Sequence, residues 1–260
     1  MSDLGSADEA AKLSIAGSVA TLTLNRPEAR NALDAAMART LRRHVLEIEA
    51  SASIRVVVVN GSGAGFCAGG DIRLVADHLD GVAPLVHRLL ADLHEFLCCL
   101  RRMPKIVLTS VHGAAAGAGL SLAMMGDLCV AADNARFVTA YAKLGVSPDC
   151  GGTVGIVEAL GIKKAMQLFL LEDELSAAQA ESFGLVNKVF PASELAGATA
   201  ALAARLSEIE PSALEATKRL LNQSPYLPLA QQLASEGEAL IACMQTPRYR
   251  EKVQRFLGWR

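Results

Sequence analysis

The segment RVVVVNGSGAGFCAGGD, residues 55–71, decides the fold class. Its first part, Arg55–Asn60, is a run of β-branched apolar residues, which is typical of a strand that is buried on both faces. Gly61 ends this run, and a glycine-rich loop continues to Asp71. A strand of this kind belongs to a sheet whose two faces are covered, as in proteins with parallel strands and helices.

The same order of elements returns later in the chain. Ile106–Val111 is a second apolar strand, and Gly113–Gly119 turns into a short helix that ends near Gly126. No charged residue occurs between Ile106 and Gly126, but polar residues and glycines interrupt the stretch, so we interpret it as a buried strand and helix and not as a membrane span. Further strands are expected at 19–25, 127–132 and 136–139, and further helices at 34–49 and 84–102. This repetition predicts an α/β architecture with parallel strands.

Composition and charge argue against several classes of function. The 260 residues carry a formal net charge of −2 and no block of basic residues, so neither a nucleic acid nor a membrane surface is an expected partner. Six scattered cysteines without a CxxC pair are typical of free thiols in a reducing compartment, not of a disulfide framework or a zinc site. Met1–Ala10 is acidic and lacks the basic and apolar segments of a signal peptide. We therefore expect a cytoplasmic protein without a bound metal.

The pattern changes after residue 190. Prolines separate four helix-like segments there: 191–209, 211–223, 227–244 and 247–257. We therefore predict an α/β core over residues 1–190 and a helical region over residues 191–260. Amphipathic helices without a sheet of their own often pack on a neighbouring chain, which predicts oligomerisation.

Two glycine-rich turns carry the chemical signal, Gly65–Asp71 and His112–Gly119. Glycine and alanine leave the backbone unshielded, so its N–H groups can approach a ligand oxygen closely. Two such donors converging on one point would form an oxyanion hole, in which one donor is worth about 3 kcal/mol of transition-state stabilisation. The alternative is that both are tight turns with close strand–helix packing. Neither turn has a GxGxxG fingerprint and the chain has no Walker lysine, so nucleotide chemistry is not supported.

Five motifs in this order resemble the enoyl-CoA hydratase/isomerase family, also called the crotonase family. They cover essentially the whole chain: NRPEARNALD at 25–34, FCAGGDI at 66–72, HGAAAGAGLSLAMMGD at 112–127, KLGVSPDCGGT at 143–153 and GLVNKVFP at 184–191. The resemblance implies a crotonase fold, that is, a parallel-sheet core of ββα units in a spiral with a helical C-terminal trimerisation region. It also implies an acyl-CoA thioester substrate, no separate cofactor, and a homotrimer or a hexamer made of two trimers.

The resemblance also assigns residues to the binding of coenzyme A and of the thioester oxygen. The family's first oxyanion donor falls on Gly70 and the second on Ala118, where the family usually has glycine. Arg30 is a candidate for a nucleotide phosphate, or an ordinary surface arginine. Other backbone positions that would line coenzyme A or the thioester are Ala29, Ala68, Asp71, Ile72 and Gly117. For Asp71, a role in a turn or helix cap is the alternative.

Departures from the family pattern bear on the reaction. The two glutamates with which hydratases of this family activate water match Ser121 and Tyr141, neither of which is an ordinary general base near neutral pH. Asp149 matches an aspartate of family isomerases and of the 4-chlorobenzoyl-CoA dehalogenase. The alternative for Asp149 is a cap of the helix expected near residue 153. His94 and Tyr141 match the dehalogenase's histidine and a tryptophan that contacts its aspartate.

The favoured function is therefore isomerisation of an unsaturated acyl-CoA, with Asp149 as acid and base and with Gly70 and Ala118 as oxyanion donors. Three alternatives stay open. These are a hydratase, a dehalogenase-like enzyme that uses Asp149 and His94, and a protein that binds acyl-CoA without catalysis.

Overall fold

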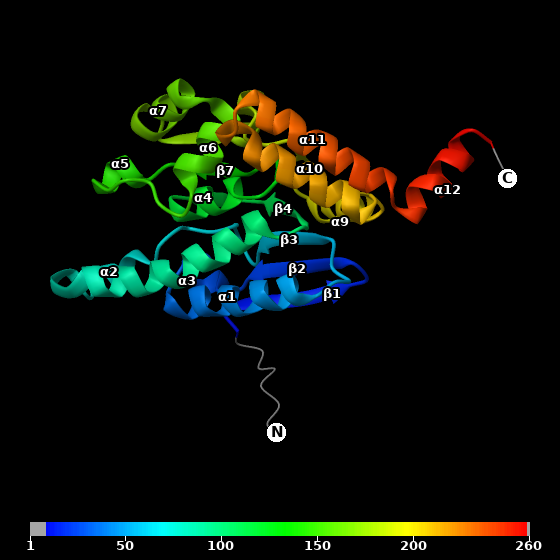
Figure 1. Cartoon of the computed structure of the whole chain (residues 1–260). Coiled ribbons are helices and arrows are strands. Elements are labelled where there is room, and N and C mark those ends of the chain that lie inside the picture. Colours follow the sequence, from blue (N-terminus) through cyan, green and yellow to red (C-terminus); the bar gives the residue numbers. More distant parts are fainter. Residues whose placement is uncertain (1–8, 259–260) are drawn as a thin grey trace. The chain divides into compact units, whose positions relative to one another are not determined.

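A six-stranded sheet forms the centre of the core, in the order β1-β2-β3-β4-β6-β9 (Figure 1). The first pair, β1 and β2, is antiparallel, and the other four pairs are parallel. A second sheet has the order β5-β7-β8. The strands are β1 Ala11–Ala16, β2 Val19–Leu24, β3 Val56–Gly61, β4 Ile106–Val111, β5 Ala114–Ala116, β6 Leu128–Ala132, β7 Arg136–Val138, β8 Glu174–Ser176 and β9 Lys188–Phe190.

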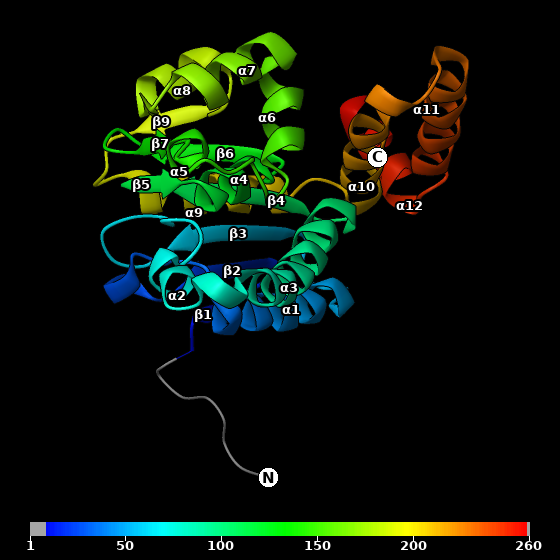
Figure 2. The same cartoon turned by 90° about the vertical axis from the view of Figure 1, so that its left-hand side faces the viewer.

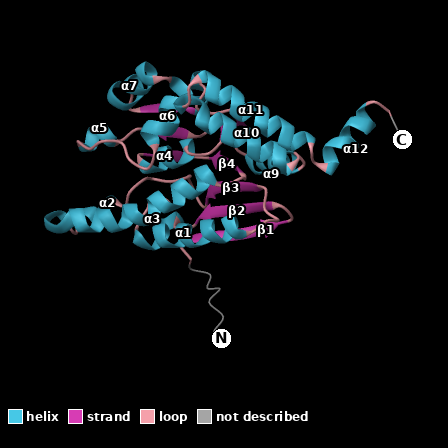
Figure 3. Ribbon diagram, viewed as in Figure 1, coloured by secondary structure: helices cyan, strands magenta, loops and turns pink. Residues whose placement is uncertain are grey.

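Residues 9–258 are described by the structure, a computed structural model. Figure 3 distinguishes the helices from the strands. The helices are α1 Ala35–Ala50, α2 Ile72–Ala76, α3 Val82–Arg102, α4 Ala118–Met124, α5 Tyr141–Leu144, α6 Gly152–Leu160, α7 Ile162–Leu171, α8 Ala177–Phe183, α9 Leu195–Ser207, α10 Pro211–Gln223, α11 Leu229–Met244 and α12 Pro247–Phe256. Single 3-10 turns lie at Pro27–Ala29, Leu79–Gly81 and Ser224–Tyr226. No described helix is long and apolar enough to span a membrane.

Strand β3 is buried on both faces, as its sequence predicts. Val57 and Val59 belong to the larger apolar cluster, together with residues of α1 and α3. Val56 and Val58 point to the other face and belong to a smaller cluster with Leu195 of α9. Side chains alternate between the two faces of a strand, so an uninterrupted run of valine fills both layers.

Helices α1 and α3 pack against each other beside strands β1 to β3 (Figure 2). Helix α1 begins where the sequence predicts, because the Asp34 carboxylate accepts a hydrogen bond from Met37 N at 2.8 Å. Its buried face includes Leu41, Val45 and Ile48, which recur at intervals of three or four residues. On α3, Phe96 is fully buried. The two helices together cover one face of the sheet.

The chain divides after Ser207 into two compact units. The smaller unit, Glu208–Arg260, contains α10, α11 and α12, whose bounds agree with three of the predicted helical segments. The fourth predicted segment corresponds to α9, which packs on β2, β3, β4 and β6 and so belongs to the larger unit. The boundary after residue 190 was predicted from a change of sequence pattern, whereas this division follows from backbone contacts.

Candidate active site

Two glycine-rich loops meet at one edge of the sheet. Strands β3 and β4 are parallel neighbours, with Val56 paired to Ile106 and Val59 to Thr109. Both loops therefore leave the sheet at the same carboxyl edge, where ligands of parallel sheets bind. A further bridge joins the loops, because Cys67 N donates to Ala114 O at 3.0 Å and Ala116 N donates to Cys67 O at 2.8 Å.

The backbone around Gly70 is held by the loop that contains Leu33. Leu33 N donates to Gly69 O at 2.7 Å, and Asp71 N donates to Leu33 O at 3.1 Å. The Gly69 carbonyl and the Gly70 N–H belong to one trans peptide group and point in opposite directions, so the N–H of Gly70 points away from Leu33. Within residues 9–258 this N–H has no recorded acceptor. Gly70 is exposed, so the donor can be reached from solvent.

Gly69 allows the two loops to approach each other. Its φ is +89°, a conformation that side chains rarely adopt. A Cβ at this position would lie 2.6 Å from Ala116 O and 3.2 Å from Ala118 N. Any larger residue at position 69 would therefore push apart the two segments that carry Gly70 and Ala118.

Ala118 is the first residue of α4, and Gly117 caps the helix with a φ of +52°. The N–H group of Ala118 has no acceptor within the helix, because the first N–H groups of a helix have no carbonyl group one turn earlier. An alanine fits here without strain, because residues inside an α-helix have negative φ. The unusual backbone angle falls on Gly117, whose own N–H donates to Val138 O at 2.9 Å.

A buried asparagine fixes the third loop at this edge. Asn31 is fully buried, and its Nδ2 donates to the carbonyl oxygens of Ser62, Gly65 and Phe66 at 2.8, 2.9 and 3.1 Å. Arg26 reinforces the arrangement with ion pairs to Asp34 at 3.1 Å and Asp71 at 3.2 Å. The loop from Arg26 to Leu33 is therefore fixed against the loop that carries Gly70.

The residues predicted to line coenzyme A gather on these two loops. Ala68 N donates to the carbonyl oxygen of Arg30 at 3.0 Å, which places Ala29 and Arg30 beside Ala68. The Arg30 side chain is exposed, and Ile72 at the start of α2 is 56% exposed. Asp71 caps α2 by accepting from Leu74 N, so it has the cap role that the sequence offered as its alternative.

Three hydrogen-bonded side chains form a series that begins in α4, the helix of Ala118. Ser121 sits one turn further along α4, and its Oγ lies 2.8 Å from Tyr141 Oη. Tyr141 Oη in turn donates to Asp149 Oδ1 at 2.7 Å. Ser121 and Tyr141 are buried and Asp149 is partly exposed. Asp149 thus lies at the solvent end of a chain that begins in the same helix as Ala118.

Asp149 does not cap the following helix. The cap of α6 is Gly151, and no side-chain hydrogen bond closes that helix end. Gly152 packs against Ser121, because a Cβ on Gly152 would overlap the serine Oγ. Close packing of α6 on α4 therefore places the Asp149 segment beside Tyr141.

Backbone strain flanks both ends of the Tyr141–Asp149 pair. Ala140 has a φ of +56° and Cys150 a φ of +51°, and each costs on the order of 1 kcal/mol for a residue with a side chain. Residues held in such conformations cluster at functional sites. Burial and the neighbouring Asp149 carboxylate raise the pKa of the Cys150 thiol, so Cys150 stays protonated beside Asp149.

Tyr141 is a proton donor in this arrangement. Burial is the main reason that the pKa of its phenol is raised far above the ordinary value. Near neutral pH the phenol therefore keeps its proton. Tyr141 consequently holds the Asp149 carboxylate and does not act as a base.

His94 is on the exposed side of α3, whereas its neighbours Leu93, Phe96 and Leu97 are buried. Among residues 9–258, no hydrogen bond joins His94 to Asp149, the two residues that a dehalogenase-like reaction would use.

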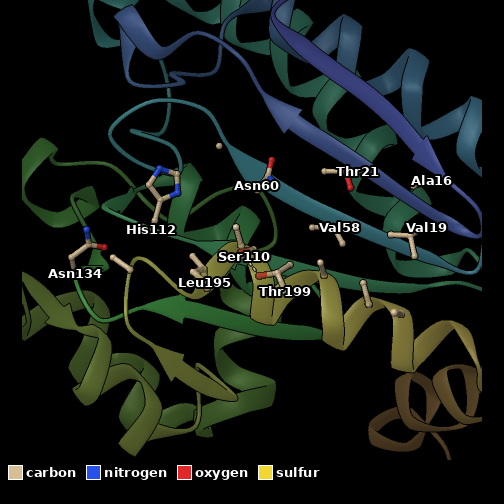
Figure 4. A pocket seen from close by; sticks show the side chains of 16 residues that line it. Ala16, Val19, Thr21, Val58, Asn60, Ser110, His112, Asn134, Leu195 and Thr199 are labelled. Carbon is tan, nitrogen blue, oxygen red and sulfur yellow. Dashed lines mark hydrogen bonds between the residues drawn. The ribbon is translucent and has the colours of Figure 1, made fainter.

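A cavity of about 610 Å³ lies on the other face of the sheet, between the strands and α9 (Figure 4). Ser110 of β4 and Thr199 of α9 hydrogen bond at its wall, with their hydroxyl oxygens 2.8 Å apart. None of the predicted site residues lines this cavity. In β4, Thr109 faces α4 by donating to Ala123 O, so the cavity and α4 lie on opposite sides of the sheet.

The sequence did not reveal the structural roles of three residues at the site. Ser121 was interpreted only as a missing glutamate, Gly69 only as part of a turn, and Asn31 not at all. The positive φ of Gly69 and the three carbonyl partners of Asn31 depend on segments that are distant in sequence. The pair of glycines at 69–70 was the one local signal for these roles: Gly69 allows the loops to approach, and Gly70 carries the backbone N–H group.

Comparisons with known proteins show the family to which this sequence is similar. The family model described as Enoyl-CoA hydratase/isomerase matches residues 14–260. The chain is 37% identical to the 1,2-epoxyphenylacetyl-CoA isomerase of Escherichia coli (strain K12), over 93% of each chain. It is 34% identical to a probable enoyl-CoA hydratase of Rhodobacter capsulatus, over 94% of this chain and 93% of the relative.

A solved structure extends the likeness to three dimensions. The crystal structure of an enoyl-CoA hydratase from Polaromonas sp. JS666 is similar with a TM-score of 0.90 and 35% identity, over 95% of this chain and 96% of that one. The fold and the sequence relatives lead to one conclusion. The chain belongs to the enoyl-CoA hydratase/isomerase family, the crotonase superfamily of enzymes that act on acyl-CoA thioesters.

Proposed function

We propose that this protein is an isomerase that moves the double bond of an unsaturated acyl-CoA thioester. The observation that carries the proposal is the Asp149 carboxylate, which Tyr141 holds at 2.7 Å while burial keeps the tyrosine protonated. Asp149 is then the side chain of this group that can take up and return a proton. A reaction that moves one proton along one substrate requires no second base.

The reaction follows from the positions of the donors and the base. The N–H groups of Gly70 and Ala118 donate to the thioester oxygen and stabilise the negative charge that develops there. Asp149 removes a proton from a carbon next to the double bond, and the C–H electron pair moves toward the thioester oxygen to give a conjugated enolate. Asp149 then returns the proton to the far end of the conjugated system. The product has the mass of the substrate, and coenzyme A is part of both.

Hydration is disfavoured because water must be both positioned and deprotonated. Ser121 and Tyr141 stand where the family's hydratases carry glutamates, and neither offers a carboxylate. The hydroxyl groups of Ser121 and Tyr141 are also hydrogen-bonded to each other, with their oxygens 2.8 Å apart. The relatives include proteins named isomerase and hydratase, and the isomerase of Escherichia coli is named for an epoxide of a phenylacetyl thioester. An aromatic acyl group therefore belongs among the candidate substrates.

The test compares the wild type with Asp149→Asn, which keeps the size of the side chain and removes its charge. Both proteins are incubated with 3-enoyl-, 2-enoyl-, epoxyphenylacetyl- and 4-halobenzoyl-CoA, and products are followed by absorbance and mass spectrometry. We expect a product of unchanged mass from an isomerisable thioester, and a loss of at least about 1,000-fold in kcat for the variant.

Other products would contradict the proposal in recognisable ways. A product heavier by one water would indicate a hydratase, and halide release would indicate the dehalogenase-like reaction. Binding of every thioester without turnover would leave a coenzyme A-binding protein. His94→Gln serves as the matched control, because isomerisation should tolerate it and a dehalogenase-like reaction should not.

We also propose that the enzyme is cytoplasmic, needs no separate cofactor and forms a trimer or a pair of trimers. One support for assembly is the outer face of α7, where Ile162, Met166 and Leu170 are spaced four residues apart and are each more than half exposed. Apolar side chains in such a row normally pack against a partner. Sedimentation velocity would test it, and a monomer at micromolar concentration would contradict it.

A further inference from the structure

We propose that Tyr141 is a positioning residue, oriented by Ser121, that holds Oδ1 of Asp149 so that Oδ2 is the oxygen that transfers the substrate proton. This inference rests on the proposed isomerase function and assigns an oxygen and a direction to its base. It is carried by two hydrogen bonds, Ser121 Oγ to Tyr141 Oη at 2.8 Å and Tyr141 Oη to Asp149 Oδ1 at 2.7 Å.

The direction of the chain follows from the number of protons. An ionised carboxylate can only accept, so the single phenolic proton of Tyr141 must point to Asp149 Oδ1. The oxygen of Tyr141 is then free to accept, and the Ser121 hydroxyl donates to it. Each donor polarises the next, which strengthens the bond that reaches the carboxylate. The chain therefore runs from Ser121 through Tyr141 to Asp149.

A fixed carboxylate suits a proton that leaves one carbon and returns to another. With Oδ1 engaged, Asp149 cannot rotate freely about its last bond, and Oδ2 keeps one position through both steps. In the first step the C–H bond breaks and an O–H bond forms at Oδ2. In the second step the O–H bond breaks and a C–H bond forms at the far carbon, so all atoms and electrons balance.

The structure supplies a substitution that changes only the hydrogen bond. The Tyr141 ring packs edge-on against Phe169, with ring centroids 6.1 Å apart and an angle of 62° between the rings. Tyr141→Phe keeps this contact and removes only the hydroxyl. Ser121→Ala removes the donor to Tyr141 and leaves the phenol in place.

A matched control exists on the other face of the sheet. Ser110 and Thr199 form a buried hydroxyl pair with the same 2.8 Å separation, next to the α9 cavity. Ser110→Ala therefore costs a comparable buried hydrogen bond without touching Asp149. Its thermal stability provides the scale for a merely structural loss.

The experiment measures kcat and KM for the wild type and these three variants, on the best substrate of the wild type. For Tyr141→Phe we expect kcat to fall by about 10- to 100-fold with KM nearly unchanged, because a misaligned base affects the chemical step. Ser121→Ala should lower kcat by a smaller factor, again with KM nearly unchanged. Ser110→Ala should change neither kcat nor KM.

Each outcome bears on a different claim. If the wild type isomerises and Asp149→Asn is inactive, but Tyr141→Phe keeps the wild-type kcat, the role of Tyr141 is overturned and the isomerase stands. If Tyr141→Phe does not fold, unchanged kinetics of Ser121→Ala overturn the role equally. If the wild type isomerises no thioester, the proposed function fails, and the Tyr141 role falls with it.

Discussion

Gly69→Ala perturbs the site without touching either proposed donor. The alanine Cβ would lie 2.6 Å from Ala116 O, and an ordinary contact begins at 3.4 Å, so the two loops must separate by about 0.8 Å. Both atoms on the far side are backbone and cannot rotate away. Gly70 follows directly, so the displacement acts on the N–H that is proposed to meet the thioester oxygen.

The magnitude can be worked out in two parts. A left-handed φ of +89° costs an alanine on the order of 1–2 kcal/mol, which lowers the Tm by roughly 2–8 °C for a protein of this size. A displacement close to 1 Å at a reacting group costs about 100-fold in rate. We therefore expect kcat/KM of Gly69→Ala to fall by about 100-fold or more while the protein stays folded.

Gly184→Ala separates these two effects. Gly184 has almost the same backbone angle, a φ of +87°, but a Cβ there would meet nothing within 4 Å. It should show the same loss of Tm with wild-type kcat/KM. Thermal melts and steady-state kinetics on the same acyl-CoA measure both. A Gly69→Ala enzyme within about threefold of wild-type kcat/KM would refute the close-approach argument.

Two further predictions concern thiols and charge. Burial raises the pKa of both Cys67 and Cys129 to about 12. Iodoacetamide at pH 8 should therefore label the exposed Cys98 long before either of them. Equal labelling rates in peptide mass spectrometry would contradict the burial of Cys67 and Cys129. A bidentate hydrogen bond from Arg102, at 2.9 and 3.0 Å, lowers the pKa of Glu49 below 4.5. This pair therefore stabilises the fold above about pH 4.5 and loses its effect as the pH falls through the lowered pKa. The Tm difference between the wild type and Arg102→Gln should shrink from pH 7 to pH 3, and a constant difference would show that the pair is not the source.

The strands and helices with strong local patterns could be predicted from the sequence. The valine run of β3 and the apolar run of β4 lie where they were expected, and α10 has the predicted bounds. These elements carry their own signal, because burial on both faces or a proline at the first turn is visible in a few neighbouring residues.

Other elements depend on distant parts of the chain. Ala114–Ala116 is a strand only because the neighbouring loop and β7 pair with it, and three alanines have little intrinsic preference for that state. Likewise, Ser121 and Asp149 lie 28 residues apart, and only the packing of α6 on α4 brings them to one phenol. Motif resemblance implied that the residue at position 141 contacts Asp149, but it did not supply the hydrogen bond from Tyr141 to Ser121.

Catalytic groups made of backbone have a consequence for genetics. On the proposed function, the two donors are amide N–H groups, which every residue except proline possesses, and position 70 has open space beside it. A mutational screen for lost activity would therefore pass over Gly70 for many substitutions, although its N–H group is proposed to act on the substrate. It would instead register Gly69 and Gly119, whose added side chains would collide with the facing loop. The positions most sensitive to substitution would therefore be neighbours of the proposed donor at position 70, and not that donor itself.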